Sequence, residues 1–334
     1  MMKKILSILA VAALFIACNP IEPDSSKGEG SLTINVKGEI VTKAITDVVG
    51  NEATVNNLQI FIFDGDICKY YFDNGTTLSK TIDKVKTGTY EIWAVANLGE
   101  TLSASISKTS LKAKALTLAQ NAAASGFVMA GMSQVEVKAS GTESVEITIT
   151  RFVARARLVK VTNSLSAGYG PVKIKYVMLD NVVSNQNIAG TAAISTWNNK
   201  MGRNSGTKID GTTRSEAPES LLGNPTERNI STGNSDTPGF RFYGYANGTS
   251  DDSTDITNWS ARKTRLVVVA EIQGAIYYYP VTLPSFARNS AYDISLTIKE
   301  LGSNDPETKP STDAVTTTIV VAPWEEGGEI TEEI

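Results

Sequence analysis

A chain of 334 residues with a net charge of -4 and no histidine is a poor candidate for several functional classes. Histidine is the commonest general base, metal ligand and triad member near neutral pH, so its absence argues against most hydrolases and zinc sites. The acidic balance argues against nucleic acid as a partner. The chain also lacks a glycine-rich phosphate loop, a Gly-x-Ser-x-Gly elbow and a paired CxxC motif. We therefore expect a protein that is not an enzyme and that uses no cofactor or metal.

The amino terminus has the pattern of a lipoprotein export signal. A lysine pair precedes an apolar run over residues 5–16, and Ala17 and Cys18 follow. The run is shorter than the roughly 20 residues that a membrane-spanning helix needs. We predict a signal peptide over residues 1–17 and lipidation of Cys18; an ordinary secretory signal with an incidental cysteine is the alternative.

A polar tether and one alternating strand follow this cysteine. The tether is rich in Pro, Ser, Gly and acidic residues, so we expect it to be flexible. Leu32, Ile34 and Val36 then alternate with polar residues, which is typical of a half-buried strand. In the connector behind this strand, the bond between Lys43 and Ala44 is open to a trypsin-like protease if the segment is exposed.

Short strands with clear turn signals continue to about residue 150. Residues 58–65 end in Asp-Gly and residues 69–75 end in Asn-Gly, a pattern typical of hairpins. Residues 101–124 contain neither glycine nor proline and are rich in Ala, Leu, Ser and Lys, so short helices are expected there. Cys68 is the only cysteine after the signal region, which excludes an intrachain disulfide, and we expect it in a half-buried strand position.

Two aspartate pairs remain as candidates for chemistry. Asp64 and Asp66 flank one turn, and Asp251 and Asp252 lie in a polar segment. Neither pair continues with the spacing of oxygen ligands in a calcium loop. We interpret both pairs as turn residues.

The second half repeats the pattern of short strands separated by Gly, Pro, Asn and Asp, which is typical of a β-sandwich. The polar stretch over residues 184–236 is expected to be a loop or an irregular insertion. Arg155 and Arg157 alternate with alanines and should lie on one face of a strand, where pairing with carboxylates is favoured over ligand binding. The tail over residues 325–334 holds five glutamates and cannot fold on its own; it is either a frayed terminus or a strand that needs a partner.

The order of these motifs resembles that of the FimA-type fimbrillins, the lipoprotein precursors of type V pili, over nearly the whole chain. The resemblance is carried by YEIWAVANLG, by TRFVARARLVKV and by a closing series with Arg288-Asn289, Tyr292-Asp293, a Gly-Ser-Asn-Asp-Pro connector and a last strand that ends in Trp324. It implies an all-β fold with a few short helices, in which two tandem transthyretin-like β-sandwich domains span residues 44–150 and 151–324.

The same resemblance implies assembly by donor-strand exchange. Residues 18–43 would be a propeptide that contains a removable first strand, and cleavage after Lys43 would leave a mature chain that begins at Ala44. The tail of a neighbouring copy, or of a related pilin, would fill the vacated groove in a head-to-tail polymer. The precursor would be anchored in the outer membrane through its lipid, and the mature chain would lie in a surface fimbrium and mediate adhesion to an unidentified receptor. The candidate donor-strand residues are Trp324, Ile330 and Ile334.

Two departures from the family pattern keep alternatives open. Lys43 stands where members cut by an arginine-specific protease carry arginine, and the tail is more acidic than a strong donor strand would be. A tip subunit, or an anchor that retains its first strand, therefore stays possible within the same fimbrium. From another class, the chain could be a monomeric surface lipoprotein that binds a glycan or protein through Trp197, Trp259 and the pair Tyr243 and Tyr245, although the tyrosines fit alternating sheet positions better.

Overall fold

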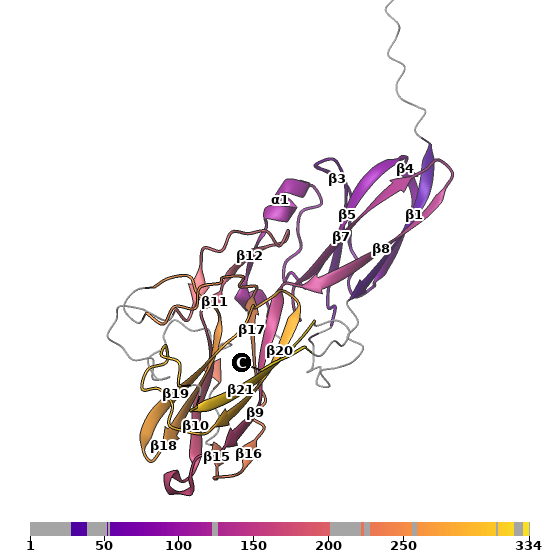
Figure 1. Cartoon of the computed structure of the whole chain (residues 1–334). Coiled ribbons are helices and arrows are strands. Elements are labelled where there is room, and N and C mark those ends of the chain that lie inside the picture. The colour runs from indigo at the N-terminus through magenta and orange to yellow at the C-terminus, as the bar shows by residue number, and fades with distance from the viewer. Residues whose placement is uncertain are drawn as a thin grey trace, which may run out of the picture.

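The computed structural model describes residues 28–38, 52, 54–121, 126–200, 222–223, 228–255, 259–311, 313–323 and 330–333. Strands make up most of this part of the chain, and one short α-helix, α1 (Lys108–Ala113), accompanies them (Figure 1). The predicted all-β fold is thus confirmed. None of the described helices is long and apolar enough to cross a membrane.

Seven strands of the first half form one sheet in the order β3-β2-β5-β7-β8-β1-β4. β7 and β8 pair only at Met129/Arg151 and Ala130/Thr150, so the two strands separate beyond this corner. The sheet thereby forms two layers that enclose a core of aliphatic and aromatic side chains. The bounds of its strands are β1 (Glu29–Gly38), β2 (Leu58–Asp64), β3 (Ile67–Asp73), β4 (Ser79–Lys86), β5 (Gly88–Ala96), β7 (Met129–Val137) and β8 (Thr142–Arg151).

Two further sheets face each other in the second half. One has the order β14-β10-β18-β19 with β15 beside β10, and the other has the order β13-β11-β17-β9-β20-β21-β22 with β16 beside β9. Buried residues of both sheets form a single core between them. The bounds are β9 (Val153–Asn163), β10 (Val172–Asp180), β11 (Val182–Val183), β13 (Trp197–Asn198), β14 (Leu222–Gly223), β15 (Arg228–Ile230), β16 (Ser235–Asp236), β17 (Phe240–Tyr245), β18 (Arg265–Ile272), β19 (Ala275–Thr282), β20 (Ser290–Ile298), β21 (Val315–Pro323) and β22 (Ile330–Glu333).

The two halves share contacts at their junction. A third hydrophobic cluster contains Phe61 and Phe127 from the first half together with Val183 and Tyr245 from the second. Two short strands, β6 (Ala115–Thr117) and β12 (Asn185–Asn187), pair across the same region. The division into two domains near residue 150 stays a prediction, and the chain passes this point with only Phe152 between β8 and β9.

The local predictions of the first half are confirmed in part. β2 and β3 form the expected hairpin, with Gly65 in the left-handed conformation at φ +60°. Cys68 is half-buried in β3, as expected. The Asn74-Gly75 turn does not close a second hairpin, because the strand after it, β4, pairs with β1. Ser107 caps α1 inside the region where helices were expected.

The prediction for the polar stretch needs correction, and part of the tail is described. Five short strands, β12 to β16, interrupt the stretch that we expected to be a loop or an irregular insertion, since each pairs with another strand. Within the tail, β22 pairs antiparallel with β21, from Val321 opposite Ile330 to Thr318 opposite Glu333, which agrees with the second alternative, a strand that needs a partner. An edge strand supplies the pairing partner that an isolated acidic segment lacks.

Candidate functional site

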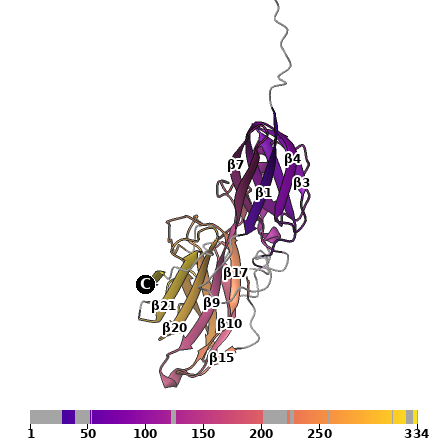
Figure 2. The same ribbon diagram turned by 90° about the vertical axis from the view of Figure 1, so that its right-hand side faces the viewer.

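The first strand lies inside its sheet, between β8 and β4 (Figures 1 and 2). It runs parallel to β8 from Ser31 opposite Thr142 to Gly38 opposite Ile149, and antiparallel to β4. Both of its backbone edges are thus paired. We call the space that β1 occupies between β8 and β4 the β1 slot.

The side chains of β1 alternate between the core and the surface, as the sequence predicted. Leu32 and Ile34 have no exposed area and Val36 is 5% exposed. All three belong to the core cluster of the first sheet. They fix β1 in the slot chiefly through burial of apolar surface.

The outer face of β1 makes polar contacts near solvent. Ser79 Oγ donates to Asn35 Oδ1 at 2.9 Å, and Asn35 Nδ2 donates to Ser144 Oγ at 3.3 Å. Lys37 forms an ion pair of 2.5 Å with Glu146, and both side chains are exposed. Such exposed contacts add little to stability.

The chain returns to the same end of β8 after it leaves β1. Gly38 lies opposite Ile149, and two residues further along β8 the Nε of Arg151 donates to the backbone oxygen of Glu52 at 2.8 Å. Residues 39–51 connect these two points. Lys43 and Ala44 lie in this connector and outside the described residues.

The two arginines singled out in β9 pair with carboxylates, which confirms the structural interpretation. Arg155 Nη1 donates to Glu52 Oε2 at 2.8 Å, and Arg157 Nε donates to Asp293 Oδ1 at 2.9 Å. The Tyr243 hydroxyl donates to the other oxygen of Glu52 at 2.6 Å. Burial, this hydrogen bond and the Glu52 charge raise the pKa of Tyr243. Glu52 lies in a weakly patterned segment, so nothing in the sequence indicated its role.

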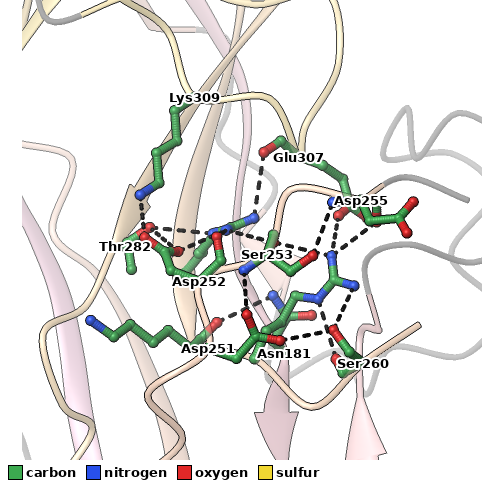
Figure 3. A network of polar contacts seen from close by, with 12 residues as sticks. Asn181, Asp251, Asp252, Ser253, Asp255, Ser260, Thr282, Glu307 and Lys309 are labelled. Atoms are coloured by element: carbon green, nitrogen blue, oxygen red, sulfur yellow. Dashed lines mark hydrogen bonds and ion pairs between the residues drawn. The ribbon is translucent and has the colours of Figure 1, made fainter. Parts of the chain in front are cut away.

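Asp251 and Asp252 belong to a polar network that joins two loops of the second half (Figure 3). Asp251 accepts hydrogen bonds from the backbone of Ser253 and from the hydroxyl of Ser260. Asp252 accepts from Arg265 Nη2 at 2.8 Å. Both aspartates lie in an irregular loop, and their interpretation as turn residues stays a prediction. Among the described residues, no group of three or more His, Cys, Asp or Glu residues could hold a metal ion.

The same network contains two fully buried arginines that sequence reasoning missed. Arg262 Nη1 donates to Glu307 Oε2 at 2.8 Å, and Arg265 is held by Asp252. Neither arginine has exposed area. Their partners come from different loops, so no local pattern could have identified them.

Asp64 is the last residue of β2, and Asp66 lies in the turn between β2 and β3, where it has a further role. Its carboxylate accepts from the backbone nitrogen and the hydroxyl of Thr109, at 2.7 and 2.8 Å. These bonds lower the pKa of Asp66. The carboxylate therefore links the β2-β3 turn to the first turn of α1.

The aromatic candidates for a glycan platform do not form one surface. Trp197 and Trp259 meet edge to face with their ring centroids 5.5 Å apart, and both are half-buried. Lys200 and Arg262 each lie 5.4 Å from the centroid of the Trp259 ring. Tyr243 and Tyr245 are sheet residues of β17, as expected, and Tyr245 is fully buried.

The remaining site predictions lie outside the described part of the chain. Cys18, Trp324 and Ile334 fall there, together with Lys43 and Ala44. Ile330 is the first residue of β22, where only its backbone position is described.

A family model described as fimbrillin-A associated anchor proteins Mfa1 and Mfa2 matches residues 24–327. The chain shares its fold with a fimbrilin (FimA) from Porphyromonas gingivalis W83, with a TM-score of 0.65 and 17% identity over 90% of this chain and 98% of that one. A protein from Bacteroides eggerthii that is described as a cell adhesion protein has a similar fold, with a TM-score of 0.64 and 17% identity over 89% of this chain and 97% of that one. The tip fimbrial protein Mfa3 from P. gingivalis matches with a TM-score of 0.51 and 13% identity over 89% of this chain and 100% of that one. No curated protein matches the sequence.

Proposed function

Because the chain belongs to the family of fimbrillin-A associated anchor proteins, we propose that it is a fimbrial subunit that is exported as a lipoprotein precursor and assembled by donor-strand exchange. The resemblance to fimbrillins that the motifs indicated is thereby confirmed, and the chain is a component of a cell-surface fimbrium. In the proposed pathway Cys18 carries the lipid that holds the precursor in the outer membrane. Cleavage between Lys43 and Ala44 then removes the lipid together with β1, and the mature chain takes part in adhesion.

The position of β1 is the observation that carries this proposal. The strand fills an interior slot, and the connector that contains Lys43 links its carboxyl end to β2, while its amino end continues into the tether that contains Cys18. Its removal would leave β8 and β4 with unpaired backbone groups beside an open core. A state of this kind favours capture of another strand.

In this proposal the chain is a structural protein and not an enzyme. Membership of the fimbrial family supports its association with other fimbrial subunits. The tail after β21 is the candidate donor segment, with Trp324, Ile330 and Ile334 as its apolar residues.

A second candidate is an anchor subunit that keeps β1 in place. The description of the matching family favours it, and so does the lysine at the cleavage position. In that case the lipid on Cys18 would hold the fimbrium to the cell, and the β1 slot would stay closed. A monomeric lipoprotein that binds a glycan is less well supported, because Trp259 already contacts Trp197, Lys200 and Arg262.

The two subunit roles are separated by the intact mass and the amino-terminal sequence of protein sheared from cells, measured beside its size. Chains that begin at Ala44 in high-mass fibres support the removable strand, and chains that begin at a lipidated Cys18 support the anchor. A Lys43→Ala variant should stay uncut, whereas Lys37→Ala in β1 should be processed as in the wild type. Processing of both variants at the same bond would refute cleavage directed by Lys43.

A further inference from the structure

The β1 slot sets strict requirements for any strand that would replace β1. Burial alternates along β1, and the buried face carries Gly30, Leu32, Ile34 and Val36. A replacement strand must therefore present three aliphatic side chains at alternate positions. It must also present a small residue at the position before them.

The requirement for a small residue comes from backbone crowding. A Cβ atom on Gly30 would lie 2.4 Å from the backbone oxygen of Lys138 and 3.0 Å from that of Gly141. Both atoms belong to the backbone of the turn between β7 and β8, which cannot yield as a side chain can. The narrow end of the slot thus fits glycine.

The requirement for apolar residues comes from the surroundings of Ile34. This residue has no exposed area, and the buried side chains of its cluster are hydrophobic. A carboxylate at this position would lose its hydration without a compensating hydrogen bond. The cluster draws these side chains from β2, β4, β5, β7 and β8; they include Leu58, Ile60, Ile62, Val85, Tyr90, Ile92, Met129, Val137, Val145, Ile147 and Ile149.

The tail of the same chain does not meet these requirements in any register. Every set of three alternate residues within 325–334 contains at least one glutamate, whichever face is turned inward and whichever way the strand runs. The best match sets Gly328 at the Gly30 position, and it then places Glu332 where Ile34 is buried. The preceding residues 315–323 offer sets without glutamate, but they are paired with β20 along their whole length.

We propose that the β1 slot of the mature chain accepts the donor strand of a different fimbrial subunit and rejects the tail of a second copy. This inference rests on the proposed function. The accepted strand carries a small residue followed by three aliphatic residues at every second position. Glu332 is the residue that prevents self-assembly. In the fimbrium, the subunit that donates its strand to this chain is consequently a different protein and not a second copy.

Strand exchange on the full-length precursor tests this inference. The precursor is nicked in the connector between β1 and β2, so that β1 stays bound without a covalent link, and is then mixed with synthetic peptides. The peptides are residues 28–38, residues 325–334, and residues 325–334 with Glu332→Ile. Native mass spectrometry measures how much β1 each peptide displaces.

We expect the 28–38 peptide to exchange, the wild-type tail to bind at least tenfold more weakly, and Glu332→Ile to recover most of that loss. Equal exchange by the wild-type tail and the 28–38 peptide would overturn the inference and leave the removable strand intact. Failure of the 28–38 peptide to exchange would overturn the proposed function itself.

A variant of the uncut precursor gives an independent check of the slot. Ile34→Glu should lower the melting temperature by at least about 10 °C, because a buried unpaired carboxylate costs several kcal/mol of stability. The double variant Leu32→Ile and Val36→Ile supplies the isoleucines of the tail without its glutamate, and it should stay within about 5 °C of the wild type. If the Ile34→Glu precursor has the same melting temperature as the wild type, the slot tolerates a glutamate. That result would refute the exclusion of the tail.

Discussion

The carboxylate of Glu52 lies 2.8 Å from Nη1 of Arg155, although 103 residues separate the two in the chain. Neither side chain is more than 2% exposed. Arg151 Nε donates a hydrogen bond to the backbone oxygen of Glu52, and the Tyr243 hydroxyl donates to its second carboxylate oxygen. Glu52, which follows the connector, is thus bound to β8, β9 and β17 together.

Loss of this carboxylate should destabilise the protein strongly. Glu52→Gln leaves the buried guanidinium of Arg155 without its counter-charge, and we expect a loss of about 3–5 kcal/mol in the free energy of unfolding. Urea denaturation measures it. Glu146→Gln is the matched control, since its ion pair with Lys37 is exposed and should contribute no more than about 1 kcal/mol. Equal effects of the two substitutions would contradict the role given to Glu52.

Truncation of a side chain in the β1 slot should leave a cavity. Ile34→Ala in the precursor is expected to cost about 2–5 kcal/mol. Asn35→Ala, on the exposed face of the same strand, should change stability by no more than about 0.5 kcal/mol. A comparable loss from both would indicate that β1 is held by its surface contacts and not by its buried side chains.

A side chain at Gly131 should disrupt the corner where β7 and β8 separate. A Cβ atom there would lie 2.0 Å from the backbone oxygen of Thr148, so Gly131→Ala requires the two strands to move apart. We expect a loss of about 1–3 kcal/mol, measured by thermal or urea unfolding. At Gly38, by contrast, no atom lies within 4 Å of the added Cβ, and Gly38→Ala should be tolerated. Similar stability of the two variants would rule out crowding as the reason for Gly131.

Glu307 should make stability fall as the pH rises towards neutrality. Burial raises the pKa of Glu307 to about 7 from 4.5, and the attraction of Arg262 and Arg265 offsets this only in part. The folded chain therefore binds more protons than the unfolded chain between about pH 4.5 and 7, so its stability decreases across that window. Glu307→Gln should remove this decrease. A wild type and variant with parallel stability curves from pH 4.5 to 7 would contradict it.

Asp252 should act in the opposite direction at lower pH. Burial raises the pKa of its carboxyl, but the hydrogen bonds from Arg265 and Lys309 outweigh burial and leave the pKa below the ordinary value of 3.8. Its contribution to stability is present above about pH 3.8 and is lost as the pH falls through the lowered pKa. Acid unfolding of Asp252→Asn should therefore show a shallower loss below pH 4 than the wild type, and an unchanged slope would refute this contribution.

Much of the fold could be predicted because its strands and turns have recognisable local sequence patterns. The alternation of Leu32, Ile34 and Val36 indicated a half-buried strand, and the same three residues are the buried ones in β1. β4 escaped prediction because its face toward the core carries few apolar residues, with Val85 fully buried and Ile82 half-buried. An edge strand of this kind is specified by the neighbour that it pairs with and not by its own sequence.

The candidate site divides in the same way. Local sequence patterns were sufficient to predict the all-β class, the family and the residues of β1 that face the core, because strand alternation and turn residues act over a few positions. The position of β1 between β8 and β4, the pairing of Glu52 with Arg155, and the partners of Arg262 and Arg265 in separate loops became known from the fold. Those contacts join residues from 13 to more than a hundred positions apart. A buried charge is satisfied by whichever partner the fold brings near, which no local pattern encodes.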